Sequence, residues 1–431
     1  GAFVPSGGFR IYAKPGTAAQ AFAAENGRKK KFYSLAMGCQ MNAHDSEKLE
    51  GMLDEMGFDR TDEETEADFI IYNTCCVREN AEQKVYGKLG WLKHYKETKN
   101  PDAVIALCGC MMQQETVLQT LRQKYRHVDI VFGTFNLYKL PELVATRMES
   151  GETVYDIWQE QREVVEDLPA IRHFPYKASV NIMFGCNNFC SYCIVPYVRG
   201  RERSRAPIDI FNEIEDLAKK GYKEITLLGQ NVNSYMQSER CNQIEESKKE
   251  TKYGYVNSFA ELLYAVNKIN GIEVIRFISP HPKDFTDDVI KAIKECEKVS
   301  KLLHLPLQSG SSEVLKKMNR KYTKEQYLQL VEKIRSEIPD VKFSTDIIVG
   351  FPGETYEDFK DTLDVVEKVN FEQVFMFIYS RRVGTPADKM TCQIPEEEKH
   401  RRFDELKELV ERQIQENNKK YIGTVHTILV E

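Results

Sequence analysis

The feature that most constrains the fold is an alternation of short apolar runs with amphipathic stretches along most of the 431 residues. The apolar runs have the length of strands, and the stretches between them carry apolar residues at helical spacing. Strands that alternate with helices favour βαβ units, which build parallel sheets. The sequence therefore predicts an α/β protein.

The alternation falls into two blocks. In the first block, strands are predicted at 32–37, 68–73, 103–107 and 128–132. In the second, they are predicted at 178–184, 224–228, 274–279, 302–307, 342–349 and 373–379. Six βα repeats suit a parallel sheet that curves into a full or partial barrel, and the pattern alone leaves the curvature open.

A prior of roughly 150 residues per domain suggests about three domains. The predicted parts are a tail or added arm (1–30), a first domain (31–150), a charged linker (151–176), a second domain (177–390), a helical connector (391–421) and the start of a further element (422–431). No apolar stretch is long enough for a membrane span, and no secretory signal is recognisable. We therefore expect a cytoplasmic protein.

Charge and cysteine content narrow the function. The net charge of -6 argues against binding of nucleic acid through bulk charge, although a local basic strip can still bind RNA. The chain has 11 cysteines. In a reducing compartment, clustered cysteines are typical of metal ligands or catalytic thiols rather than of disulfides.

One cysteine cluster lies directly after the first predicted strand of the second domain. Cys186, Cys190 and Cys193 have the spacing C-x3-C-x2-C. Three thiolates can hold three irons of a 4Fe–4S cluster and leave the fourth iron open for a small molecule. Structural zinc usually takes four protein ligands, and ferredoxin clusters take a fourth Cys. The alternatives are a zinc site that borrows a distant ligand and three unconnected thiols.

A second set of cysteines is spread along the first domain. Cys39, Cys75 and Cys110 each follow a predicted strand and precede a predicted helix. Neighbouring parallel strands lie about 4.8 Å apart. Loops at one edge of the sheet can therefore bring these thiols to one cluster. The other five cysteines are interpreted as plain thiols: Cys76, Cys108, Cys241, Cys296 and Cys392.

The C-x3-C-x2-C spacing, with Tyr192 before its last cysteine, is similar to the signature of radical S-adenosylmethionine (SAM) enzymes. In that family SAM binds the open iron and is cleaved to a 5'-deoxyadenosyl radical. Both cysteine sets together resemble the methylthiotransferase family, over about 31–431. The resemblance implies two 4Fe–4S clusters and SAM as cofactors. It also implies a six-stranded partial barrel and, from 422–431, the start of a small β-barrel domain called TRAM.

The motif Gly-Cys-Gln-Met-Asn at 38–42 and the segment 185–205 resemble one branch of this family. That branch adds a methylthio group to carbon 2 of N6-isopentenyladenosine beside the tRNA anticodon. The implied partners are a tRNA anticodon stem-loop, a low-potential electron donor and a sulfur source. The alternative substrates are threonylcarbamoyladenosine in tRNA and an aspartate of ribosomal protein S12. An alternative of another class is a non-catalytic iron–sulfur or zinc protein that binds RNA.

Further candidate residues follow the predicted strands of the second domain. By resemblance, the candidate SAM contacts are Gln230, Asn231, Gln308, Ser309 and Arg320, the last through the SAM carboxylate. The alternative is that these residues serve turns and helix caps. A basic run just after the cysteine loop consists of Arg199, Arg201, Arg203 and Arg205. It can hold tRNA phosphates or form an ordinary solvated surface.

Overall fold

The computed structural model describes residues 18–23, 29–76, 79–160, 164–165, 167–238 and 244–425. The chain divides into two compact units. The N-terminal unit holds residues 1–173 and 197–200, and the C-terminal unit holds residues 174–196 and 201–431. Within the described ranges, no helix has the length and apolar character needed to cross a membrane.

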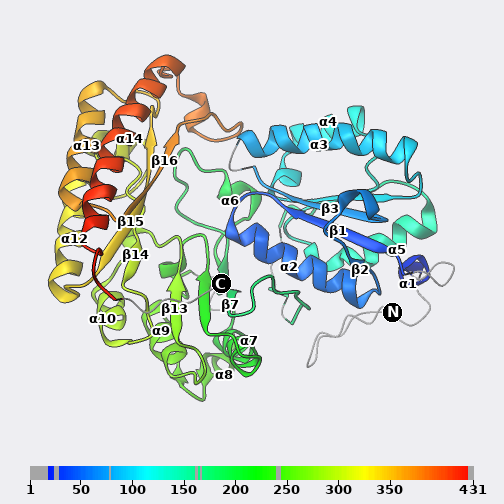
Figure 1. The fold of residues 1–431 in the computed structure, drawn as a ribbon, viewed down its shortest axis with the longest axis horizontal. Coiled ribbons are helices and arrows are strands. Elements are labelled where there is room, and N and C mark those ends of the chain that lie inside the picture. Colours follow the sequence, from blue (N-terminus) through cyan, green and yellow to red (C-terminus); the bar gives the residue numbers. More distant parts are fainter. Residues whose placement is uncertain are drawn as a thin grey trace. The chain divides into compact units, whose positions relative to one another are not determined.

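The N-terminal unit is built on a six-stranded sheet with the order β2-β1-β3-β4-β5-β6, in which every pair is parallel. The strands are β1 (Lys31–Ala36), β2 (Asp59–Arg60), β3 (Phe69–Thr74), β4 (Val104–Gly109), β5 (Ile130–Phe132) and β6 (Val154–Asp156). Its longer helices are α2 (Gln40–Glu55), α3 (Glu79–Thr98), α4 (Glu115–Lys124) and α5 (Leu140–Ser150). Figure 1 shows α3 and α4 on one face of the sheet and α2 on the other. Every residue of β3 and β4 is buried, as expected for central strands covered on both faces.

The predicted linker 151–176 needs correction, because most of it belongs to the N-terminal unit. Its residues 154–156 form β6, which pairs with β5. The amide of Ile171 donates to the carbonyl of Glu47 at 2.9 Å. Both edge strands, β2 and β6, escaped prediction because they are short and none of their residues is fully buried.

Part of the predicted tail 1–30 is also structured. The helix α1 (Ala18–Ala23) packs with α5, and Phe22 and Ala23 join the apolar core of the N-terminal unit. Residues 1–17 and 24–28 lie outside the described residues.

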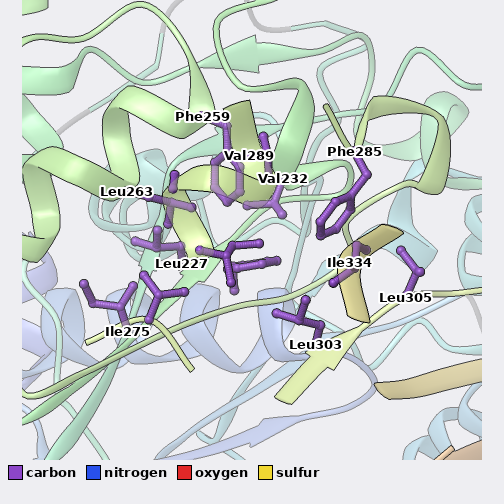
Figure 2. Packing of buried hydrophobic residues seen from close by; sticks show 14 of the residues in the cluster. Leu227, Val232, Phe259, Leu263, Ile275, Phe285, Val289, Leu303, Leu305 and Ile334 are labelled. Carbon is purple, nitrogen blue, oxygen red and sulfur yellow. The ribbon is translucent and has the colours of Figure 1, made fainter. Parts of the chain in front are cut away.

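The C-terminal unit carries the six strands that the sequence predicted. They form two parallel three-stranded sheets, β13-β10-β7 and β14-β15-β16, and a bridge links Ile275 of β13 to Val299. The strands are β7 (Lys177–Asn181), β10 (Glu224–Leu228), β13 (Val274–Phe277), β14 (Leu302–His304), β15 (Lys342–Val349) and β16 (Gln373–Ile378). The helices between them include α7 (Pro207–Lys219), α9 (Phe259–Asn267), α10 (Asp287–Glu295), α12 (Lys324–Glu337) and α13 (Tyr356–Val369). Figure 2 shows Leu227 and Ile275 of the sheet beside Leu263 of α9 in the buried core.

The long helix α14 (Glu396–Lys419) covers β16 and α13. Leu406 and Val410 on this helix are buried in the same core. Arg402 forms a buried ion pair with Glu354 at 2.7 Å. The predicted connector is therefore an integral layer of the C-terminal unit. The predicted start of a TRAM domain at 422–431 falls mostly outside the described residues, which end at 425.

Two candidate cysteine sites

The strand-end site consists of Cys39, Cys75 and Cys110, which follow the neighbouring strands β1, β3 and β4. Gly38 and Gly109 precede two of these cysteines with φ of +111° and +96°, a backbone conformation that favours glycine. A Cβ on Gly38 would lie 2.3 Å from the Cβ of Cys75. The loops therefore approach closely because one position has no side chain. Parallel pairing brings together cysteines that are distant in sequence.

Asn42, a fully buried residue of α2, connects the three loops of this site. Its Nδ2 donates to the carbonyl of Met37 at 3.0 Å and to that of Thr74 at 2.9 Å. Its Oδ1 lies 3.9 Å from the Sγ of Cys39 and 3.7 Å from the Sγ of Cys110, both within range of a thiol hydrogen bond. One side chain thus fixes the relative positions of all three loops.

Arg199 reaches the strand-end site from the segment 197–200, which belongs to the N-terminal unit. Its Nε donates to the Sγ of Cys110 at 3.2 Å. Its Nη2 donates to Asp45 at 2.7 Å and to the Oδ1 of Asn42 at 2.8 Å. The residue is only 5% exposed, so the guanidinium is committed to protein groups.

The electrostatics of the site favour thiolates. A hydrogen bond from Cys75, helped by the positive charge of Arg199, lowers the pKa of Cys39 to about 5. A hydrogen bond from Cys76 and the same arginine lower the pKa of Cys110. Metal ligands must be deprotonated, so these shifts suit a metal site.

Two neighbouring cysteines behave differently. The hydrogen bond that Cys76 makes to Cys110, together with burial, holds the pKa of Cys76 well above the usual value. Burial does the same to the pKa of Cys108. Their exclusion from the ligand set stays a prediction, because burial also raises the pKa of thiols at the loop site.

The donor set has the chemistry of iron–sulfur ligands. The three thiols follow neighbouring strand ends, two of them have a lowered pKa, and one accepts a hydrogen bond from a buried arginine. The ligand roles themselves stay a prediction.

The loop site consists of Cys186, Cys190 and Cys193. Its loop leaves β8 (Met183–Phe184) and returns to β9 (Arg203–Ser204), and these two short strands pair antiparallel. The strand β8 follows directly after β7. The loop therefore begins near the carboxyl end of the first parallel strand, where ligands of parallel sheets bind.

Hydrogen bonds from neighbouring segments hold this loop. Glu202 accepts from the backbone and the side-chain amide of Asn187, at 3.2 and 3.4 Å. Asn319 donates to the carbonyl of Phe189 at 2.9 Å. Burial raises the pKa of Cys186 and of Cys193 to about 12. A bound metal overrides such an effect, because a coordinating thiol is deprotonated.

Arg320 lies beside the loop site and is buried. Its Nε donates to the hydroxyl of Tyr322 and its Nη2 to the carbonyl of Pro306, both at 3.0 Å. Its Nη1 is 3.5 Å from the Sγ of Cys190 and 3.5 Å from the hydroxyl of Tyr192. This position next to a cysteine of the site is compatible with the predicted contact to a carboxylate at the open iron.

Two other candidate residues also lie at the loop site. The side-chain oxygen of Gln230 accepts from the amide of Gly185 at 2.5 Å. Asn231 donates to Asp284 at 2.9 Å and to Glu202 at 3.4 Å, whereas its buried Oδ1 has no partner in the described structure. A buried acceptor without a hydrogen bond costs free energy, so the Oδ1 of Asn231 is available to accept a hydrogen bond from a ligand.

The remaining two candidates differ from each other. Ser309 is fully buried and its hydroxyl lies 3.3 Å from that of Thr362 on α13. Gln308 has φ of +74°, a rare conformation for a non-glycine residue that marks a constrained position. Sequence reasoning missed Asn181, a buried residue whose Nδ2 and Oδ1 both lack a partner in the described structure. The sequence feature that could have indicated Asn181 is its position as an amide side chain at the carboxyl end of β7.

The basic run does not form one exposed strip. Three of its members are buried: Arg199, Arg203 and Arg205. Arg205 pairs with Glu213 at 2.6 Å. Arg201 is exposed and lies over the ring of Phe189, 4.2 Å from its centroid. Only Arg201 of the four arginines is exposed, and the RNA contact of the run stays a prediction.

Comparison with known families matches both units. Residues 180–366 match the radical SAM superfamily. Residues 31–133 match a family described as uncharacterized protein family UPF0004. These matches cover the loop site and the strand-end site, respectively.

Solved structures share the fold at low sequence identity. A radical SAM methyltransferase, TsrM from Kitasatospora setae with tryptophan and a SAM analogue bound, has a TM-score of 0.58 at 13% identity, over 84% of this chain and 75% of that one. The same enzyme with cobalamin and a 4Fe-4S cluster has a TM-score of 0.56 at 14% identity, over 83% and 73%. These likenesses confirm the α/β fold class.

Curated relatives are much more similar. Proteins named tRNA-2-methylthio-N(6)-dimethylallyladenosine synthase are 56% identical in Acetivibrio thermocellus, over 94% of this chain and 81% of the relative. The Clostridioides difficile protein of that name is 56% identical over 94% and 82%. The Clostridium tetani protein is 54% identical over 95% and 87%. The chain belongs to the family of tRNA-2-methylthio-N(6)-dimethylallyladenosine synthases, a branch of the radical SAM methylthiotransferases.

Proposed function

We propose that this enzyme adds a methylthio group to carbon 2 of N6-isopentenyladenosine beside the anticodon of tRNA. The observation that carries the proposal is a three-cysteine site in each unit, in a chain 56% identical to synthases named for this product. One site suits the generation of a radical and the other suits the supply of sulfur. A non-catalytic RNA-binding protein has no need of both.

The chemistry explains why a radical is required. The C–H bond at carbon 2 of the base is not acidic, so no general base can remove its proton at useful rates. A 4Fe–4S cluster that binds SAM would supply the carbon radical that takes the hydrogen atom, a second cluster would carry the sulfur, and another SAM would supply the methyl group of the methylthio product. The protein contributes the ligands, the orientation of the cofactor and the exclusion of water.

Residues of the loop site have distinct roles in this proposal. Cys186, Cys190 and Cys193 hold three irons. Arg320, whose Nη1 lies 3.5 Å from the Sγ of Cys190, binds the carboxylate of SAM. The free Oδ1 of Asn231 accepts a hydrogen bond from SAM. At the strand-end site, Cys39, Cys75 and Cys110 hold the second cluster.

The partners follow from the reaction. Cleavage of SAM consumes one electron, so a low-potential donor is needed. The product contains a sulfur atom, so a sulfur source must replace it. The target adenine lies in a single-stranded loop, where bases can be splayed out for recognition. Arg201 is our candidate for a phosphate contact, and a tRNA substrate favours a cytoplasmic location.

The test is an anaerobic assay with the reconstituted full chain, reductant, SAM and tRNA that bears isopentenyladenosine. We expect 5'-deoxyadenosine and 2-methylthio-N6-isopentenyladenosine in digests analysed by mass spectrometry. Cys392→Ala removes an exposed thiol outside both sites and serves as the control.

Two other outcomes are informative. Formation of 5'-deoxyadenosine without the modified nucleoside would move the assignment to threonylcarbamoyladenosine or to the S12 aspartate. If neither product forms while both sites carry iron, the enzyme assignment is wrong.

A further inference from the structure

The position of Arg199 is unexpected for a residue of an alternating basic run. It lies six residues after Cys193 in sequence, yet it belongs to the N-terminal unit, where it contacts Cys110. Its side chain is 5% exposed. A residue with this burial is not available to phosphates on the surface.

Several directed hydrogen bonds fix the side chain of Arg199. Asp45 and Asn42 lie three residues apart on α2, so both face the same side of the helix. They hold the Nη2 of Arg199 at 2.7 and 2.8 Å. The planar guanidinium is then fixed, and its Nε points at the Sγ of Cys110.

The partners that hold Arg199 are themselves buried. Asp45 is 3% exposed and Asn42 is 0% exposed. Removing both charges of an ion pair from water is costly unless hydrogen bonds satisfy each group. The geometry is therefore narrowly defined, and the donor on Nε has the cysteine sulfur as its partner.

We propose that Arg199 is a positioning residue for the cluster of the strand-end site, where it orients Cys110 and raises the reduction potential of that cluster. The inference rests on the second cluster of the proposed function. Hydrogen bonds to ligand sulfurs are a main way in which proteins set such potentials. A reduced cluster carries one more negative charge, so a donor to its ligand stabilises the reduced form more. Asp45 offsets much of the arginine charge, which leaves the hydrogen bond as the main contribution.

The experiment isolates this cluster in the full chain. The triple variant Cys186→Ala, Cys190→Ala, Cys193→Ala serves as the parent, because its only predicted cluster is at the strand-end site. Iron and sulfide content, the electron paramagnetic resonance spectrum of the reduced state and the midpoint potential are measured. If the parent binds no iron, the second cluster of the proposed function is refuted and the inference falls with it.

Arg199→Met with Asp45→Asn removes the donor without leaving a buried carboxylate unpaired. We expect this variant to keep its iron and to show a more negative midpoint potential and a changed spectrum. An unchanged potential at full iron content would overturn the inference. Arg199→Lys keeps the charge, but its single nitrogen cannot reproduce the separate Nη2 and Nε hydrogen bonds to Asp45 and to the Sγ of Cys110. It should shift the potential in the same direction by less, and it decides the question if the double variant does not fold.

Arg147→Met with Asp129→Asn is the matched control. Arg147 also forms an ion pair with a buried aspartate of the N-terminal unit, and its Nε and Nη2 both donate to Asp129, at 3.1 and 2.9 Å. The control should lower thermal stability at least as much, because Asp129 also pairs with Lys96, and it should leave the potential unchanged. An equal shift of potential in this control would show that the effect is structural and would overturn the inference.

Discussion

The two cysteine sites differ in how the chain assembles them. The strand-end site joins positions 39, 75 and 110, which only the parallel pairing of β1, β3 and β4 brings together. The loop site collects its cysteines within one loop between β8 and β9. The first site therefore depends on the fold of a whole sheet, whereas the cysteines of the second lie in one loop that hydrogen bonds from neighbouring segments hold. Substitutions that disturb the packing of this sheet should therefore disrupt the strand-end site more than the loop site.

The largest expected effects separate the sites by function. Cys186→Ala should abolish formation of both 5'-deoxyadenosine and the methylthio nucleoside, because the loop site loses a ligand. Cys110→Ala should still produce 5'-deoxyadenosine and should form no methylthio nucleoside. Both products are measured by mass spectrometry in one assay. If Cys110→Ala retained full product formation, the division of labour between the sites would be wrong.

A backbone change should act on the strand-end site alone. Gly38→Ala puts a Cβ 2.3 Å from the Cβ of Cys75 at a φ of +111°. We expect a loss of about 1–3 kcal/mol in stability, measured by denaturant unfolding, and loss of iron from that site.

Gly87→Ala on α3 is the control for this change, because a Cβ there meets nothing within 4 Å. It should stabilise the chain by about 0.5–1 kcal/mol and leave the iron content unchanged. Equal iron contents in the two glycine variants would contradict the close approach of the loops.

Asn42→Ala tests the side chain that connects the three loops. It leaves the carbonyls of Met37 and Thr74 without their donor, which should cost about 1–3 kcal/mol. Iron content of the strand-end site should fall several-fold. Asn136→Ala is the matched control, since Asn136 is fully buried and donates to the carbonyl of Asp156 at 2.8 Å. The control should lose similar stability and keep its iron.

The smallest expected effect concerns RNA. Arg201→Gln should weaken tRNA binding a few-fold and reduce the slope of log affinity against log salt by about 1, as for loss of one phosphate contact. Its stability should stay within about 0.5 kcal/mol, because the residue is exposed. Arg401→Gln, which replaces an exposed arginine on α14 that pairs with Glu398, should leave binding unchanged. Indistinguishable salt slopes would remove Arg201 from the interface.

Sequence reasoning recovered the elements that bury apolar residues and missed those that do not. The strands β3, β4 and β15 are mostly buried and were predicted within two residues of their bounds. The edge strand β6 has half-buried residues and was interpreted as linker. The local C-x3-C-x2-C spacing identified the loop site, whereas the position of each cysteine between a predicted strand and a predicted helix indicated the strand-end site. The role of Arg199 could not be predicted, because its partners Asp45 and Cys110 are far away in sequence.

The contribution of 197–200 to the N-terminal unit has a consequence for synthesis on the ribosome. Chains emerge from the N-terminus and domains generally fold as units. A nascent chain that ends at His173 contains every strand of the first sheet but lacks Arg199, so Asp45 has no buried cation to pair with. The N-terminal unit is therefore completed only after the entire cysteine loop has been translated. For the same reason, a fragment that stops at the apparent domain boundary is not a faithful substitute for this unit.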